Sequence, residues 1–117
     1  MSKTTVYYNP RCSKCRQALA ILNERGIEPE LREYLQDPPR REELEELMTL
    51  LGTDDPRSFV RSKESAFAEL GLADAEAGAV LEAISDHPAL LERPIVVRAG
   101  RAVVARPPEL LLDILED

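Results

Sequence analysis

One short segment near the start of the chain, NPRCSKCRQA (residues 9–18), restricts the fold more than any other. It follows a β-branched and aromatic run over residues 4–8, which predicts a strand closed by an Asn-Pro turn. Beyond the turn, apolar residues recur at helical spacing until Gly26, which predicts a helix. Cys12 then stands at the start of that helix and Cys15 lies one turn further on.

The middle of the chain is predicted to be helical. A second β-rich run, Leu31 to Leu35, predicts a strand that ends before the Pro38-Pro39 turn. After this turn the apolar residues follow helical spacing, and Gly52 ends the clearest of these helices. Asp55-Pro56 is typical of an N-cap followed by proline at the first helical position. The helical patterns cover residues 44–51 and 55–59, the surroundings of Phe67 and Leu70, and residues 76–86.

A β-hairpin and a last helix are predicted for the end of the sequence. Two β-rich runs, Ile95 to Arg98 and Arg101 to Ala105, flank Ala99-Gly100 at the spacing of a tight hairpin. Pro107-Pro108 then opens a helix. The order βαβ, helices, ββα, with C-x-x-C in the first βα unit, predicts an α/β thioredoxin-like (glutaredoxin-like) mixed sheet with a helical insertion at about residues 40–88.

Size and charge limit the possible functions. Residues 1–117, of which 44% are apolar, suffice for a single domain that buries roughly two thirds of its unfolded surface. The net charge is −7 and the acidic residues are spread along the helical patterns, which argues against a nucleic-acid or membrane partner. Because no apolar run suits a signal peptide or a transmembrane helix, we expect a soluble, cytoplasmic protein. The few aromatic residues and the acidic composition lead us to expect a monomer.

Although the net charge of the chain is negative, its first segment is basic. Before Glu24 the sequence holds four basic residues and no acidic one. They are Lys3, Arg11, Lys14 and Arg16. This end of the molecule is therefore expected to attract anions.

Cys12 has the sequence context of a reactive thiol. The reacting species is the thiolate, and the unpaired N–H groups at a helix start lower a thiol pKa, typically to roughly 3.5–7.5. We expect Arg11, Lys14 and Arg16 to act in the same direction. The same N–H groups suit an oxyanion held close to the sulfur.

Cys15 is in phase with the apolar positions of its helix and is predicted to face the core. One interpretation makes it a resolving thiol that forms a disulfide with Cys12 after Cys12 has reacted. The other makes it a small buried hydrophobe. A zinc site is the weaker hypothesis, since the one further nitrogen ligand is His87 and no second cysteine pair follows.

Five segments together resemble one known family in order and over nearly the whole chain. They read YYNPRCSKCRQAL, YLQDPP, VRSKESAFAELGL, HPALLERPIVV and ARPPELLLDIL. This set closely resembles the glutaredoxin-coupled, ArsC-type arsenate reductases. A lone C-x-x-C is a weak signal, whereas the ordered set is specific.

The resemblance implies a role for each residue that falls on a family motif. Cys12 would be the nucleophile, and Arg61, Arg93 and Arg106 would bind and polarise the oxyanion. Pro94 is similar to the cis-proline that thioredoxin-like folds place beside their active cysteine. Planar guanidinium groups suit this task because each can hold two oxygens of a tetrahedral anion.

The implied reaction is the reduction of arsenate to arsenite. Cys12 would attack the arsenic, and glutathione would attack the adduct; glutaredoxin, or thioredoxin in its place, would then act as reductant. The resemblance implies no bound metal or organic cofactor.

Two positions depart from the family pattern. Tyr8 stands where the family commonly has a histidine that tunes the cysteine, and Arg11 is a candidate to compensate. Cys15 is not found in the well-studied reductases and resembles the related Spx regulators, which use a C-x-x-C switch while binding RNA polymerase. Those regulators lack the ARPPELLLDIL segment. The alternatives to a reductase are thus a Spx-like redox-switched regulator and a general thiol-disulfide oxidoreductase.

Overall fold

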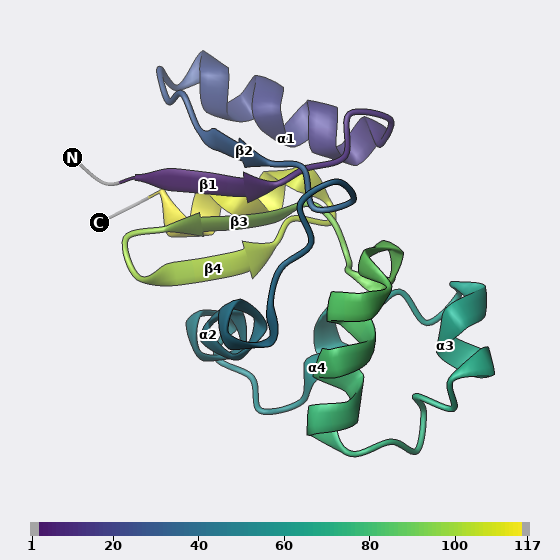
Figure 1. The fold of residues 1–117 in the computed structure, drawn as a ribbon. Helices are drawn as coiled ribbons and strands as arrows, with labels where there is room; N and C mark the ends of the chain where they lie inside the picture. The colour runs from purple at the N-terminus through teal and green to yellow at the C-terminus, as the bar shows by residue number, and fades with distance from the viewer. Residues whose placement is uncertain (1–2, 116–117) are drawn as a thin grey trace. The chain divides into compact units, whose positions relative to one another are not determined.

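The computed structural model describes residues 3–115 and divides the chain into two compact units (Figure 1). The first unit combines the two ends of the chain, up to Tyr34 and from Arg93 onward. The second is the continuous segment Leu35–Glu92, which contains the predicted insertion. That the units behave as a single domain stays a prediction.

A four-stranded mixed sheet is the frame of the first unit, with the strand order β2-β1-β3-β4. Strand β1 pairs in parallel with β2 and antiparallel with β3, and β3 pairs antiparallel with β4. Val6 of β1 lies opposite Leu31 on one side and Val96 on the other, so β1 is a central strand. The strands are β1 (Thr4–Tyr7), β2 (Glu30–Arg32), β3 (Ile95–Arg98) and β4 (Arg101–Val104).

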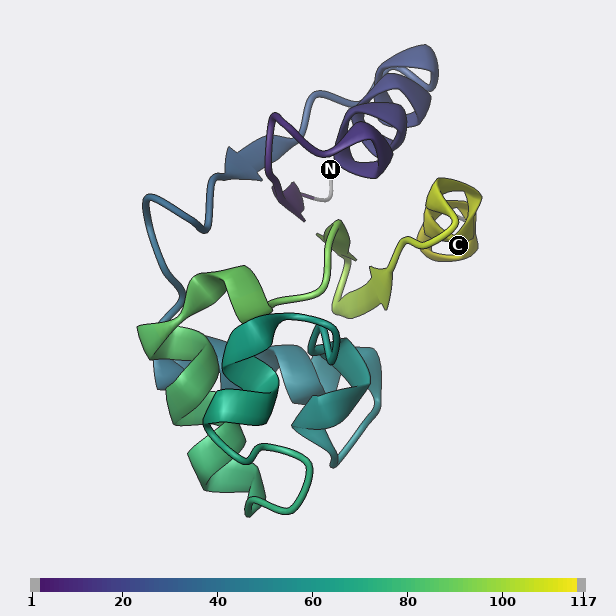
Figure 2. The same cartoon turned by 90° about the vertical axis from the view of Figure 1, so that its right-hand side faces the viewer.

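Two helices cover one face of this sheet. They are α1 (Ser13–Glu24) and the 3-10 helix η3 (Pro108–Ile114), which pack against each other. Figure 1 shows α1 above the strands and η3, in yellow, behind them, and Figure 2 shows both helices on the right of the strands. Sheet and helices share one apolar core, so both cysteines lie inside the unit. Its buried members are Val6, Tyr8, Cys12, Cys15, Ala18, Leu22, Val96, Ala105, Leu111 and Ile114. The βα-plus-ββα arrangement is the predicted thioredoxin-like fold.

The second strand differs from its prediction. It ends at Arg32 instead of Leu35, because its neighbour β1 offers partners no further. Tyr7 pairs with Arg32, and the N–H of Tyr8 donates the last hydrogen bond to the Arg32 carbonyl at 2.8 Å. Strand β1 ends there at the Asn-Pro turn, so residues 33–35 have no β1 residues with which to pair.

The predicted hairpin is confirmed. Strands β3 and β4 turn at Ala99 and Gly100, whose φ angles are 53° and 75°. Positive φ at both central residues is the combination that a two-residue turn needs to match the twist of its strands. Ala99 is the strained member, because its Cβ disfavours this region.

The second unit consists of short helices around its own apolar core. Gly52 ends α2 at φ 73° and donates its N–H to Met48, as the sequence predicts. No helix within residues 3–115 has both the length and the apolar character needed to cross a membrane. The helices are α2 (Arg41–Leu51), η1 (Pro56–Phe59), α3 (Ser65–Glu69), α4 (Ala77–Asp86) and η2 (Pro88–Leu90). Fully buried members of the core include Leu44, Phe59, Val80, Ile84, Leu90 and Leu91.

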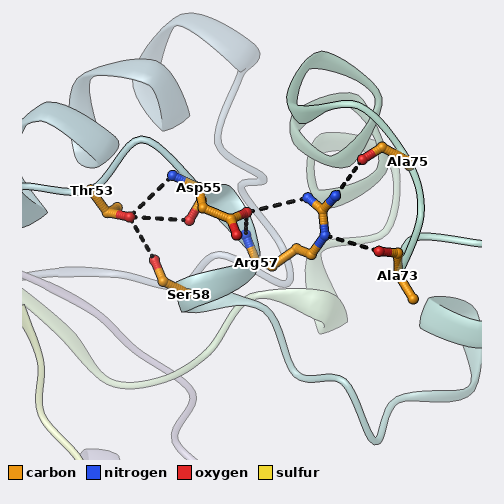
Figure 3. Close-up of polar contacts among 6 residues, drawn as sticks. All are labelled: Thr53, Asp55, Arg57, Ser58, Ala73 and Ala75. Carbon is orange, nitrogen blue, oxygen red and sulfur yellow. Dashed lines mark hydrogen bonds and ion pairs between the residues drawn. The ribbon is translucent and has the colours of Figure 1, made fainter.

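Arg57 fastens η1 to the loop before α4, as Figure 3 shows. Its guanidinium donates to the carbonyls of Ala73 and Ala75 and pairs with Asp55 at 3.2 Å. The Asp55 carboxylate also accepts the N–H of Arg57 at 3.0 Å, so the predicted N-cap is confirmed. On the other side of the turn, Thr53 and Ser58 bond through their hydroxyl groups.

Candidate active site

A tight turn places Cys12 at the start of α1. The N–H of Cys12 donates to the Asn9 carbonyl at 2.9 Å, and the Asn9 side chain accepts the N–H of Arg11 at 3.0 Å. Arg16, in the first turn of α1, reaches back with its guanidinium to the Pro10 carbonyl at 2.8 Å. Cys12 is the N-cap residue, so its side chain lies where the first backbone N–H groups of the helix converge.

These surroundings favour the thiolate of Cys12. Burial raises its pKa, but the backbone N–H groups of Cys15 and Lys14, the Cys15 thiol and the positive charge of Arg93 lower it. The lowering prevails, so the pKa of Cys12 lies below the ordinary 9.0. The side chain makes no regular capping hydrogen bond, and the amides act on the sulfur as dipoles.

The expected contribution of the nearby basic side chains is corrected by this result. Among the described residues, the charged side chain that lowers the pKa of Cys12 is Arg93; Lys14 acts through its backbone N–H, and the charges of Arg11, Lys14 and Arg16 are not among the causes. Arg11 and Arg16 are exposed to solvent, which screens them. Arg11 therefore does not compensate for the missing histidine through the thiol.

Cys15 is fully buried one turn into α1, as predicted. Burial, together with the hydrogen bond to Cys12 and its charge, raises the pKa of Cys15 to about 12, against a lowering by the Asn9 backbone and Arg93. At neutral pH Cys15 is thus a neutral thiol that donates to Cys12. Both cysteines are reduced in this structure. The arrangement suits a resolving thiol and a core residue alike.

Two Arg-Pro segments of the first unit meet at the end of the sheet. The Arg106 guanidinium donates to the Arg93 carbonyl at 2.9 Å, and the N–H of Ala105 donates to the Pro94 carbonyl at 2.8 Å. The Arg93-Pro94 bond is cis, as the resemblance implies, and so is Arg106-Pro107. Cys12, Arg93, Pro94 and Arg106 thus belong to one unit.

Arg61 belongs to the second unit and has contacts of its own there. Its guanidinium lies 3.1 Å from the Glu64 carboxylate and 3.4 Å from the Ala89 carbonyl. Its backbone N–H donates to the Leu90 carbonyl at 2.7 Å. The anion-binding role of Arg61 stays a prediction.

Three features of the site were not predicted individually. Asn9 was interpreted as a turn residue, yet its side chain also caps the backbone before Cys12, and asparagine at such a turn is a sufficient signal for this. The second cis bond shares its Arg-Pro sequence with the first. Tyr8 packs in the core with both cysteines. No group of three or more His, Cys, Asp or Glu side chains in residues 3–115 is arranged to hold a metal ion.

A mixed sheet with two thiols at the start of α1, one of them activated, defines a thioredoxin-like thiol protein. Comparison with known proteins narrows this class. A family model described as the ArsC family matches residues 7–114. The chain belongs to the ArsC family.

Several relatives match over nearly their whole length. The chain is 45% identical over 117 residues to a protein named arsenate reductase from Neisseria meningitidis, covering 98% of this chain and 100% of the relative. It is equally similar, 45% over 112 residues and 94% of both chains, to the uncharacterized protein YfgD of Escherichia coli. The solved structure named arsenate reductase from Vibrio cholerae superposes with a TM-score of 0.93 at 43% identity, covering 96% and 97% of the two chains. This confirms the fold.

Proposed function

We propose that this protein reduces arsenate to arsenite through a covalent adduct on Cys12. The observation that carries the proposal is the lowered pKa of Cys12 in a unit that also holds Arg93 and Arg106. Membership of a family whose relatives are named arsenate reductases supports the choice of substrate. We place the reaction in the cytoplasm, where thiols are kept reduced.

In the first step the Cys12 thiolate attacks the arsenic atom of arsenate. A sulfur–arsenic bond forms, and one arsenate oxygen leaves as water after it has taken up protons. Arsenic remains in the +5 state. The N–H groups at the start of α1 and the guanidinium of Arg93 stabilise the negative charge that collects around the sulfur and the oxyanion.

In the second step a thiolate attacks the sulfur of Cys12. A disulfide bond forms, the sulfur–arsenic bond breaks, and its electron pair stays on arsenic, which leaves as arsenite in the +3 state. The attacking group is glutathione, followed by glutaredoxin, or else it is Cys15. Cys15 is placed for this step by its hydrogen bond to Cys12, and adduct formation removes the Cys12 thiolate charge, one of the smaller causes that raise the pKa of Cys15, while burial, the largest cause, remains.

Arginines supply the binding site for the anion. Arg93 already acts electrostatically on both thiols, and Arg106 is tied to the Arg93 carbonyl. On the resemblance alone we add Arg61, whose pairing with Glu64 would have to yield to a stronger anion. Each guanidinium offers two parallel donors to a tetrahedral oxyanion.

A general thiol-disulfide oxidoreductase is the second candidate. The hydrogen bond between the two thiols favours it, since such a pair closes to a disulfide with little rearrangement. The hypothesis of a Spx-like regulator depends on the same pair of thiols. Substitution of Arg93 distinguishes a reductase of arsenate from a disulfide oxidoreductase, because disulfide exchange needs Cys12 and does not need a ligand for an oxyanion.

The test is arsenate-dependent consumption of NADPH by the purified protein with glutathione, glutaredoxin and glutathione reductase, repeated with thioredoxin and its reductase. We expect turnover that disappears in Cys12→Ser. Cys15→Ser is the matched control: it keeps turnover if glutathione resolves the adduct and loses turnover if Cys15 does. Absence of arsenate-dependent turnover in the unaltered protein, with either reductant, would refute the proposal.

A further inference from the structure

Two cationic side chains flank Cys12 and form no ion pair or hydrogen bond within residues 3–115. Arg11 directly precedes Cys12 and is exposed; Lys14 follows it and is half-buried. Neither side chain takes part in an ion pair or hydrogen bond among the described residues. Arg16, the third basic residue of this turn, does have a structural contact, with the Pro10 carbonyl.

The two side chains also do not act on the thiol itself. The pKa of Cys12 is lowered by backbone N–H groups, by Cys15 and by Arg93, and neither Arg11 nor Lys14 contributes through its charge. The activation of Cys12 therefore does not require them. They are two cations within two residues of a reactive cysteine, in a protein whose net charge is −7.

An acidic protein that places uncompensated cations beside its reactive thiol is suited to an anionic reaction partner. Arsenate is one such partner, but Arg93 is the cation whose charge acts on both thiols, which makes it the better candidate to hold arsenate. The second reactant at this sulfur is the reducing thiol. A small thiol with a carboxylate on either side of its sulfur matches one cation before Cys12 and one after it.

We propose that Arg11 and Lys14 bind the carboxylates of the small thiol that reacts with Cys12, so that the site selects an acidic thiol of the glutathione type over an uncharged one. This inference rests on Cys12 as the reacting thiol of the proposed function. It does not depend on arsenate as the substrate.

Thiol–disulfide exchange tests the proposal without arsenate. The Cys12 thiolate attacks one sulfur of oxidised glutathione; a Cys12–glutathione disulfide forms, the disulfide bond of the reagent breaks, and one glutathione leaves as a thiolate. The reaction is run in the Cys15→Ser background, so that the adduct persists and is counted by mass spectrometry. Bis(2-hydroxyethyl) disulfide serves as the uncharged reagent.

The measured quantity is the ratio of the two rate constants, charged reagent over uncharged reagent. This ratio cancels any change in the reactivity of Cys12 itself. We expect it to fall about 10-fold when Arg11→Glu and Lys14→Glu are combined, and by less in the Arg11→Gln and Lys14→Gln variants. The matched control is Arg25→Glu, an exposed charge reversal just after the other end of α1, which leaves the ratio unchanged.

Each result decides the question. An unchanged ratio in the double variant, or an equal fall in Arg25→Glu, would overturn the proposal, the latter because net charge alone would then explain the effect. A loss confined to a protein reductant, with the glutathione ratio intact, would overturn it in favour of a protein partner. A protein that shows the expected ratios but does not turn over arsenate would keep this inference and lose the proposed substrate.

Discussion

Arginines have opposite uses in the two units. In the second unit Arg57 donates to two carbonyls and pairs with Asp55, and these contacts join two segments of that unit. In the first unit Arg93 acts on both thiols, while Arg11 enters no ion pair among residues 3–115. The comparison teaches that the same guanidinium group joins segments where it meets carbonyls and a carboxylate, and lowers a thiol pKa where it lies near a thiol.

The sharpest test asks whether the first unit is built around a thiolate. Because its pKa is raised to about 12, the Cys15 thiol is almost entirely un-ionised at pH 7. We expect iodoacetamide to alkylate Cys12 at least about 1,000-fold faster than Cys15, read from peptide masses. Because the pKa of Cys12 is lowered below 9.0, its alkylation rate should rise with pH, reach half its maximum below 9.0 and then level off. Unfolding in urea provides the control, since it should make the two thiols alike; similar rates in the folded protein would contradict the site.

Removing Arg93 should have the next largest effect. We expect Arg93→Ala to lower kcat/KM for arsenate by about 100-fold to 1,000-fold, because a preorganised charge beside the thiolate is lost. The pKa of Cys12 should rise, since Arg93 lowers it. Arg93→Lys keeps the charge without the planar pair of donors and should recover the pKa better than the activity. An unaltered pH profile of alkylation in Arg93→Ala would show that Arg93 does not face the thiol.

Arg57→Ala should lower the stability of the protein and leave its activity nearly unchanged, the opposite of what we expect for Arg93. We expect it to lower the free energy of unfolding by about 2 kcal/mol in a urea titration, because two carbonyls and Asp55 lose a charged donor. The value of kcat/KM per folded molecule should stay within about twofold. Arg57→Lys, which retains the charge, should recover part of the stability. A large loss of activity in a stably folded Arg57→Ala protein would show that Arg57 does not have a purely structural role.

The smallest effect is expected at Arg41, which pairs with Glu45 and Glu82 at 3.3 and 3.4 Å on an exposed surface. Solvent screens such pairs, so Arg41→Ala should cost about 0.5 kcal/mol, and less in 1 M salt. Glu82→Gln breaks one of the two pairs and should show a similar or smaller loss under the same conditions. A loss as large as that of Arg57→Ala would mean that Arg41 is also a structural clamp.

Local patterns in the sequence predict the local structure of this protein well. The Asn-Pro turn, the cap at Asp55 and the end of α2 at Gly52 each depend on neighbours within a few residues, and all are confirmed. The strand after Leu31 was extended too far because its end depends on a partner strand more than twenty residues earlier in the chain. Strand ends are set by the ladder and only partly by the composition of the strand.

The candidate site shows the same contrast between local features, which the sequence predicts, and features that depend on residues distant in the chain. That Cys12 caps a helix is a local property, and so is the burial of Cys15 one turn later. Which cation acts on the thiol is not local. Beside Cys12 in the sequence, Arg11 is exposed and Arg16 donates to the Pro10 carbonyl. Arg93, which acts on the thiols, comes from the segment before β3, and β3 pairs with β1. The family resemblance singled out Arg93, and periodicity alone did not.

The first unit is built from the two ends of the chain, and this affects how it folds during synthesis on the ribosome. The second unit is one continuous segment and is complete once Glu92 has been made, but β1 must wait for β3 before its second edge is paired. Arg93 and Arg106 are therefore synthesised long after Cys12, which until then lacks the charge that lowers its pKa. Until then the causes that lower the pKa of Cys12 are those within α1, and the further lowering by Arg93 is added only when the end of the chain has been translated and has paired with the beginning.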